Sequence, residues 1–120
     1  MTTVYRLISA NDWQAAQVAG EFRGSAHDRR DGFIHFSTAE QLADTARIHY
    51  AGQPGLLLLY VRTKALAPPA EWRWEASRGG ALFPHLYASL PTTAVHRVEP
   101  LPLDANGLHC LPDLESAQST

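Results

Sequence analysis

The chain has 120 residues, the usual size of a single domain. Hydrophobic residues make up 45% and charged residues 18%, a balance typical of a globular rather than a disordered chain. Ten basic and twelve acidic residues give a net charge of -2, which argues against binding to duplex nucleic acid through a basic surface. With Cys110 as the single cysteine, an internal disulfide and a cysteine-rich zinc site are excluded.

The N-terminal residues lack the basic and apolar regions of a secretory signal. No apolar run approaches the ~20 residues needed to cross a bilayer, and the longest, residues 56–61, has the length of a strand. We therefore expect a cytoplasmic protein with no membrane partner.

The first elements follow from local signals. Residues 4–8 contain β-branched and aromatic side chains, which predicts a strand. A helix over residues 10–19 comes next, because Ser9 can cap its start and Gly20 can end it. The polar stretch 24–32 shows no periodicity, which predicts a loop.

A second strand and helix are predicted in the next segment. Residues 33–36 have strand character, and a helix over residues 38–50 follows directly. Ser37 and Glu40 have the spacing of a capping box, so Ser37 is the expected N-cap.

Extended structure is expected in the second half. The run 56–61 predicts a strand buried on both faces, residues 72–75 a half-buried strand, and residues 94–99 a last strand. Residues 82–86 are also expected to be extended, but Pro84 argues against a central position in a sheet.

This order predicts an α+β fold with two helices in the first half, packed on a small, strongly bent, mixed or antiparallel sheet. Residues 1–100 are expected to form one domain, followed by a partly frayed C-terminal extension, residues 101–120. No glycine-rich dinucleotide fingerprint or phosphate-binding loop is present in the sequence.

Polar residues within apolar surroundings mark a first candidate site. Strand alternation places His35 on the same face as Phe33 and Ser37. The helix that follows presents free N–H groups and a positive dipole end, which favours a phosphate or carboxylate ligand. The alternative is that Ser37 only caps the helix and His35 is a hydrogen-bonded core histidine.

A second candidate site lies in residues 74–87. Glu75 and Arg78 can pair, Gly79 allows a ligand to approach the backbone, and the neighbouring aromatic residues favour burial of His85. The alternative is an ordinary salt bridge, a flexible loop and an aromatic core cluster. Both interpretations remain open.

Two further chemistries involve both histidines. A zinc site is not predicted, because neither His35 nor His85 belongs to a known zinc-binding spacing. Two-histidine phosphodiesterases use paired His-x-Thr motifs, and residues 35–37 resemble one such motif. Residues 85–87 lack the second hydroxyl in the required form, so this activity is a minor alternative.

Several strings resemble bacterial proteins of the domain-of-unknown-function family numbered 952. These are GFIHFST within residues 32–38, LFPHLY at residues 82–87, and the Trp74-Glu75 pair between them. The resemblance covers roughly residues 3–100 and implies a fold similar to ADP-ribosyltransferases.

Transferases of that fold bind NAD in a cleft between two small sheets. They use an Arg or His on an early strand, an aromatic-x-Ser-Thr element that opens a helix, and a late Glu. The resemblance implies that Arg6, the segment 32–38 and Glu75 occupy these places. His35 within the second element and the absence of a Glu-x-Glu pair depart from the pattern.

The resemblance therefore implies an NAD- or nucleotide-binding enzyme of ADP-ribosyltransferase type, and the candidate residues predict a small anionic ligand as partner. No cofactor is firmly predicted, and NAD is the candidate substrate. The alternatives are a non-catalytic binding module of the same fold and a purely structural domain. The expected catalytic residues are His35, Glu75 and His85, and the expected ligand-binding residues are Arg6, Ser37, Thr38, Arg78, Gly79 and Tyr87.

Overall fold

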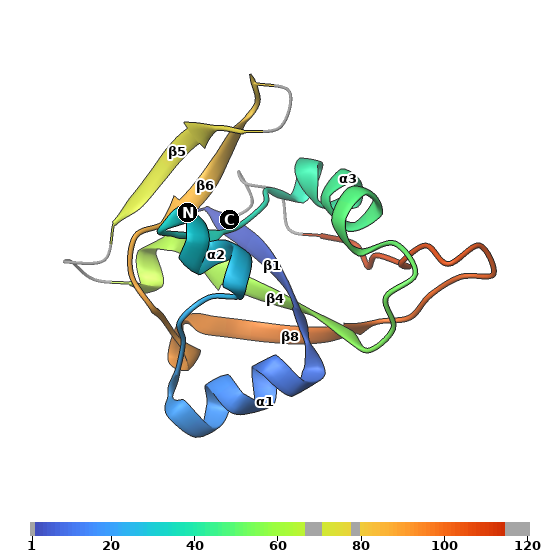
Figure 1. Cartoon of the computed structure of the whole chain (residues 1–120), viewed down its shortest axis with the longest axis horizontal. Helices are drawn as coiled ribbons and strands as arrows, with labels where there is room; N and C mark the ends of the chain where they lie inside the picture. The colour runs from blue at the N-terminus through green and yellow to red at the C-terminus, as the bar shows by residue number, and fades with distance from the viewer. Residues whose placement is uncertain (1, 67–70, 78–79, 115–120) are drawn as a thin grey trace.

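A three-stranded antiparallel sheet in the order β1-β4-β8 forms the centre of the molecule (Figure 1). The computed structural model describes residues 2–66, 71–77 and 80–114. In chain order the elements are β1 (Thr3–Ser9), α1 (Ala10–Ala19), β2 (Glu21–Phe22), α2 (Ala26–Asp31), β3 (Ile34–His35), α3 (Ala39–Tyr50), β4 (Leu56–Arg62), η1 (Thr63–Ala65), β5 (Trp72–Ala76), β6 (Leu82–Leu86), β7 (Leu90–Pro91), η3 (Thr92–Ala94) and β8 (Val95–Leu101).

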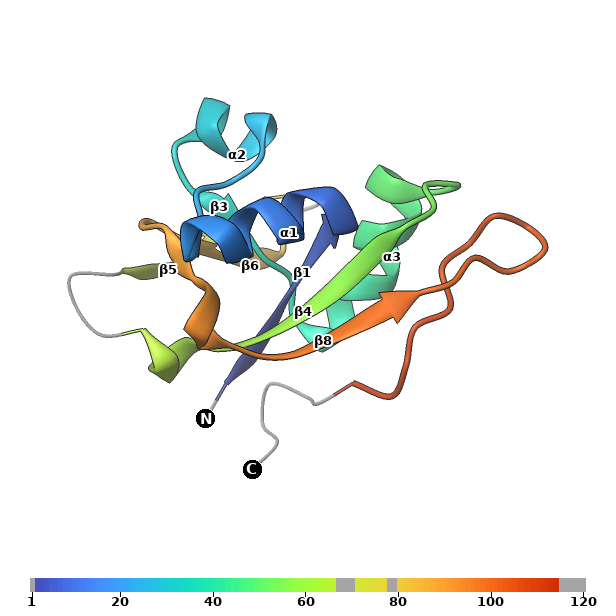
Figure 2. The same ribbon diagram turned by 90° about the horizontal axis from the view of Figure 1, so that it is seen from below.

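Helices α1 and α3 cover opposite faces of this sheet (Figures 1 and 2). Alternate residues of β4 therefore enter two different cores, with Leu59 beside Trp13 of α1 and Leu58 beside Leu42 of α3. Burial on both faces explains the uninterrupted apolar sequence of β4, as predicted. No helix among the described residues is long and apolar enough to cross a membrane.

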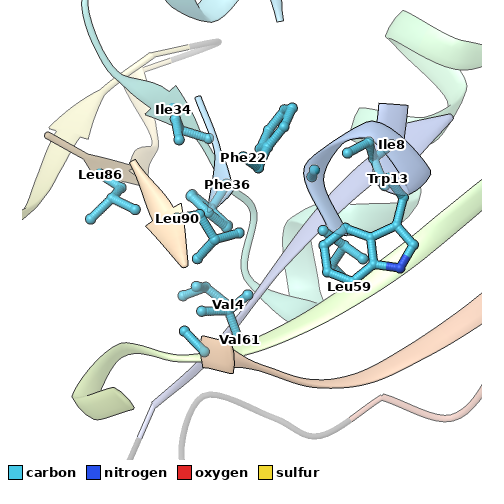
Figure 3. Packing of buried hydrophobic residues seen from close by; sticks show 12 residues of the cluster. Val4, Ile8, Trp13, Phe22, Ile34, Phe36, Leu59, Val61, Leu86 and Leu90 are labelled. Atoms are coloured by element: carbon cyan, nitrogen blue, oxygen red, sulfur yellow. The ribbon is translucent and has the colours of Figure 1, made fainter. Parts of the chain in front are cut away.

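The core on the α1 side joins the central sheet to a second sheet. Figure 3 shows Val4 and Leu59 of the central sheet in the same cluster as Ile34, Phe36 and Leu86. Burying an aliphatic or aromatic side chain of this size contributes roughly 1.5–3 kcal/mol. The shared core thus holds the second sheet against the first.

The second sheet has the order β3-β6-β5, and its β5–β6 hairpin extends away from the central sheet (Figure 1). The expectation that Pro84 would keep its strand out of a central position is wrong, because β6 is the middle strand. The Pro84 carbonyl accepts a hydrogen bond from Phe36 N at 3.0 Å. The β3 ladder pairs only Ile34 and His35 with β6, so it requires no donor from Pro84.

The prediction of a loop over residues 24–32 is wrong. This segment contains α2, which begins at a capping box between Ser25 and Asp28 and ends at Gly32 in the left-handed conformation. Six residues are too few to show apolar periodicity, and the buried residue of α2 is the polar Asp28. The described part of the chain therefore has three α-helices, not two.

Helix α3 begins one residue later than predicted. Thr38 is the N-cap and forms a capping box with Gln41, whereas Ser37 and Glu40 were expected to do so. The backbone of Ser37 is held by Tyr5 of β1, with N–H···O distances of 2.8 and 2.9 Å in the two directions. That bridge keeps Ser37 extended, so that Thr38 becomes the N-cap of α3.

The fold is α+β as predicted, but the strands that the structure describes form three antiparallel sheets rather than one bent sheet, the third being the short β2–β7 pair. After Leu101 the chain folds back, and Leu111 and Leu114 pack on the α3 side of the central sheet. The predicted fraying of residues 115–120 lies outside the described residues. The domain boundary at residue 100 remains a prediction.

Candidate functional site

A cavity of about 260 Å³ lies beside β1, β3, β6 and α3. Four of the predicted site residues line it: Arg6, His35, Ser37 and His85. Thr38, Glu75 and Tyr87 are not among its lining residues, and Arg78 and Gly79 lie outside the described residues. The structure therefore unites the two histidine segments at one cavity.

The two histidines are brought together by strand pairing. His35 of β3 lies directly opposite His85 of β6, and their ring centroids are 5.4 Å apart. Phe33 stacks on His85 with a centroid distance of 4.0 Å and an interplanar angle of 19°. Phe33, which precedes β3, and His35 lie on one side of the chain, as alternation predicts, and both rings contact His85.

His85 is oriented by a carboxylate on the neighbouring strand. Its Nδ1 lies 2.8 Å from Oε1 of Glu75, and the Tyr87 hydroxyl donates to the same oxygen at 2.8 Å. These hydrogen bonds, from His85 first and Tyr87 second, hold the pKa of Glu75 below its usual value. Glu75 is thus a partner of His85 rather than a wall of the cavity.

The second nitrogen of His85 is buried without a partner. The residue is 3% exposed, and within the described part of the chain no atom forms a hydrogen bond with His85 Nε2. A buried polar atom of this kind is uncommon in folded proteins.

Asp28 is the buried acceptor that organises the other side of the cavity. Its Oδ1 accepts hydrogen bonds from Arg6 Nη1 at 2.9 Å and from the His35 backbone N–H at 3.1 Å. Its Oδ2 accepts from Ser25 N at 2.6 Å. Burial alone would raise the pKa of Asp28, but the hydrogen bonds and the Arg6 charge outweigh burial and hold it far below the usual range.

The side chain of His35 lies between two carboxylates. Nδ1 is 2.7 Å from Oδ1 of Asp28, and Nε2 is 2.9 Å from Oδ2 of Asp31. His27, four residues before Asp31 on α2, places its Nε2 3.1 Å from the same oxygen. Burial would raise the pKa of Asp31, but the His35 hydrogen bond and the nearby positive charges lower it.

Sequence reasoning missed Asp28, Asp31 and His27, because it assigned their segment to a loop. The signals were the acidic residue three positions after Ser25 and the i,i+4 spacing of His27 and Asp31. Both signals acquire meaning only when the segment is helical.

The hydroxyl groups at the start of α3 have structural partners. Ser37 Oγ lies 2.9 Å from Thr45 Oγ1, and the Thr38 hydroxyl accepts from Gln41 N. Arg6 is also a predicted ligand-binding residue. Its Nε donates to the Leu7 carbonyl, and its Nη1 donates to the Asp28 carboxylate and to the His35 carbonyl. Among the described residues, Arg6 Nη2 has no hydrogen-bond partner.

Comparison with known families gives a match over residues 7–98 to a protein family of unknown function, DUF952. The chain belongs to the DUF952 family. The match includes β3, β6 and both histidines of the cavity.

Solved structures of the protein CC0527 from Caulobacter crescentus are similar to the structure of this DUF952 protein. The crystal structure is 46% identical, with a TM-score of 0.83, covering 91% of this chain and 94% of that chain. The solution structure is 47% identical, with a TM-score of 0.78, covering 90% and 91% of the two chains. No match was found among curated proteins.

Proposed function

We propose that this DUF952 protein binds a small phosphate-bearing ligand of the nucleotide class in the cavity, with His85 as its acid or base. The observation that carries the proposal is the buried Nε2 of His85, which lacks a partner among the described residues. His85 lines the cavity, and its other nitrogen is already held by Glu75.

The Glu75–His85 pair has the arrangement of an oriented base. When Nδ1–H donates to a carboxylate, Nε2 of the neutral ring carries a lone pair and accepts a proton. Stacking against Phe33 restricts the ring further. Glu75 acts here as a positioning residue, because its carboxylate contacts His85 and Tyr87.

Arg6 supports an anionic ligand. It lines the cavity, is 7% exposed, and its planar guanidinium suits phosphate or carboxylate groups. Asp28 offsets part of this charge, so the unpartnered Nη2 is the donor that we assign to the ligand. The volume of about 260 Å³ is just below the ~300–1,000 Å³ of typical ligand pockets, which suits one nucleotide unit.

We also propose a more specific function within the nucleotide class, namely an ADP-ribosyltransferase-like fold and activity with NAD as substrate. It is supported by the position of the cavity between strands of two small sheets, by Arg6 on the first strand, and by Ser37 beside the start of α3. The cavity volume indicates that one half of NAD would be enclosed and the other half would lie outside.

Two-histidine phosphodiester hydrolysis is a second candidate. It is favoured by the direct cross-strand pairing of His35 and His85. It is weakened by the carboxylates of Asp28 and Asp31, which occupy both nitrogens of His35. Only His85 keeps a nitrogen available for proton transfer.

The test combines ligand binding with turnover. NAD, ADP-ribose, AMP and pyrophosphate are titrated in a thermal-shift assay, where a ligand at 100 times its dissociation constant adds ~2.7 kcal/mol, a shift of ~10 °C. Release of nicotinamide from NAD is followed in parallel. We expect a shift with at least one nucleotide, and we expect Glu75→Gln to retain binding while losing turnover.

His96→Ala is the matched control, because His96 is exposed on β8 and does not line the cavity. Binding without turnover in the unaltered protein would favour the non-catalytic module over the enzyme. No shift with any nucleotide, or equal shifts in the His85→Asn and unaltered proteins, would contradict the proposed site.

A further inference from the structure

We propose that His27, Asp31 and His35 bind a divalent first-row transition metal at the exposed side of the cavity. Each residue offers one ligand atom, and these three atoms lie within 4.8 Å of one another. Both histidines also line the cavity, so an ion bound there would face the same space as His85.

The spacing of the three side chains fits a small metal ion. Oδ2 of Asp31 lies 3.1 Å from His27 Nε2 and 2.9 Å from His35 Nε2. Neighbouring ligand atoms of a tetrahedral Zn²⁺ with bonds of about 2.0–2.2 Å are about 3.3–3.6 Å apart. Binding of an ion would therefore lengthen the two distances to Asp31 Oδ2 by a few tenths of an ångström.

Two elements hold the ligands in place. The i,i+4 spacing puts His27 and Asp31 on one side of α2, and β3 brings His35 up to them. Nδ1 of His35 lies 2.7 Å from the buried carboxylate of Asp28. A metal-bound histidine usually donates its second N–H to such a carboxylate, which fixes the ring and increases its basicity as a ligand.

Local charge favours a cation at this point. Asp28 and Asp31 bring two negative charges to His35. Arg6 pairs with Asp28, and Arg30 Nε lies 3.6 Å from Oδ1 of Asp31, so that Oδ2 of Asp31 is the oxygen that contacts the two histidines. A neutral imidazole has one N–H, so it cannot donate to both carboxylates at once. A metal ion bound to His35 Nε2 would leave the proton on Nδ1, which donates to Asp28. The same ion would bind Asp31, so that both ring nitrogens and both carboxylates have partners.

The donor set indicates the class of metal. Two imidazoles and one carboxylate suit Zn²⁺, Fe²⁺ or Co²⁺, whereas Mg²⁺ and Ca²⁺ prefer oxygen ligands. Three protein ligands leave positions open for water or a ligand, as in catalytic rather than structural zinc sites.

The experiment is a titration of the full chain, without a polyhistidine tag and freed of metal by a chelator. Zn²⁺ binding is measured by calorimetry, and Co²⁺ binding by its visible absorption. We expect one ion per chain. His27→Ala and Asp31→Ala should each weaken binding at least about tenfold, since changes to outer-shell partners alone cost about 10–100-fold.

His27 has a side chain 54% exposed, so its removal leaves the core intact, and His96→Ala is again the control. Absence of saturable binding below millimolar Zn²⁺, or unchanged affinity in both ligand variants, would overturn the metal site. The titration contains no nucleotide, and the nucleotide assay can be run with a chelator. The failure of one proposal is therefore distinguishable from the failure of the other.

Discussion

His35 and His85 are direct cross-strand partners on β3 and β6, although α3, β4 and β5 separate them in the sequence. Their ring centroids lie 5.4 Å apart, yet their environments differ. His35 is enclosed by Asp28 and Asp31, whereas His85 has one carboxylate partner and one unpartnered nitrogen. This asymmetry is the reason why we propose proton transfer at His85 and cation binding at His35.

The tautomer of His85 is the first prediction. The Glu75 carboxylate contacts Nδ1 of His85 and not its Nε2. We therefore expect the neutral ring to carry its proton on Nδ1 and to leave Nε2 unprotonated. Long-range nitrogen–proton NMR correlations of the imidazole measure this directly. Glu75→Ala should produce a mixture of tautomers, and a proton found mainly on Nε2 in the unaltered protein would contradict the oriented base.

The titration of Glu75 is the second prediction. Its pKa is lowered in the folded state by His85 and then Tyr87, so its stabilising effect is present above the unfolded pKa of about 4.3 and is lost as pH falls through the folded value. Carboxyl NMR should therefore place the Glu75 midpoint below that of an ordinary Glu. Tyr87→Phe should move the midpoint upward, and an unchanged midpoint would contradict the hydrogen bond.

Replacing Asp28 is expected to destabilise the fold strongly. Asp28→Asn leaves Arg6, which is 7% exposed, without its charged partner, and removing one member of a buried ion pair costs about 3–5 kcal/mol. Chemical denaturation with chelator present measures the loss. Asp44→Asn is the control, because its pair with Arg47 is exposed and an exposed pair contributes only about 0–1 kcal/mol. Similar losses in the two variants would contradict a special role for Asp28.

Gly24 should tolerate no side chain. Its φ of +101° is strained for other residues, and an added Cβ would lie 2.8 Å from Asp28 Cβ. Backbone strain of about 1–3 kcal/mol adds to overpacking of similar size, so Gly24→Ala should cost at least about 2 kcal/mol. Gly20→Ala carries the strain without the contact, because nothing lies within 4 Å of its Cβ, and should cost less. Thermal unfolding of both variants decides the order.

The start of α3 gives the last prediction. Thr38 accepts from Gln41 N, so Thr38→Ala should cost about 1 kcal/mol and speed amide exchange at Gln41. Ser37→Ala removes a contact with Thr45 instead and should leave that amide protected. Hydrogen exchange that responded to Ser37 and not to Thr38 would restore the cap expected from the sequence.

Elements with strong local signals were predictable from the sequence. The bounds of α1 follow from Ser9, which accepts from Asp12 N, and from Gly20 in the left-handed conformation. The apolar run of β4 reflects burial on both faces of the central sheet. The convergence of His35 and His85 was predictable too, because isolated polar residues in apolar segments must find partners when buried.

Contacts between segments that are distant in the sequence were decided only by the tertiary structure. The bridge between Tyr5 and Ser37 moved the cap of α3 by one residue. The β5–β6 register placed Glu75 diagonal to His85, and the packing of α2 against β1 buried Asp28 beside Arg6. Sequence periodicity reports which face of an element is buried, but it carries no information on which distant polar group meets that face.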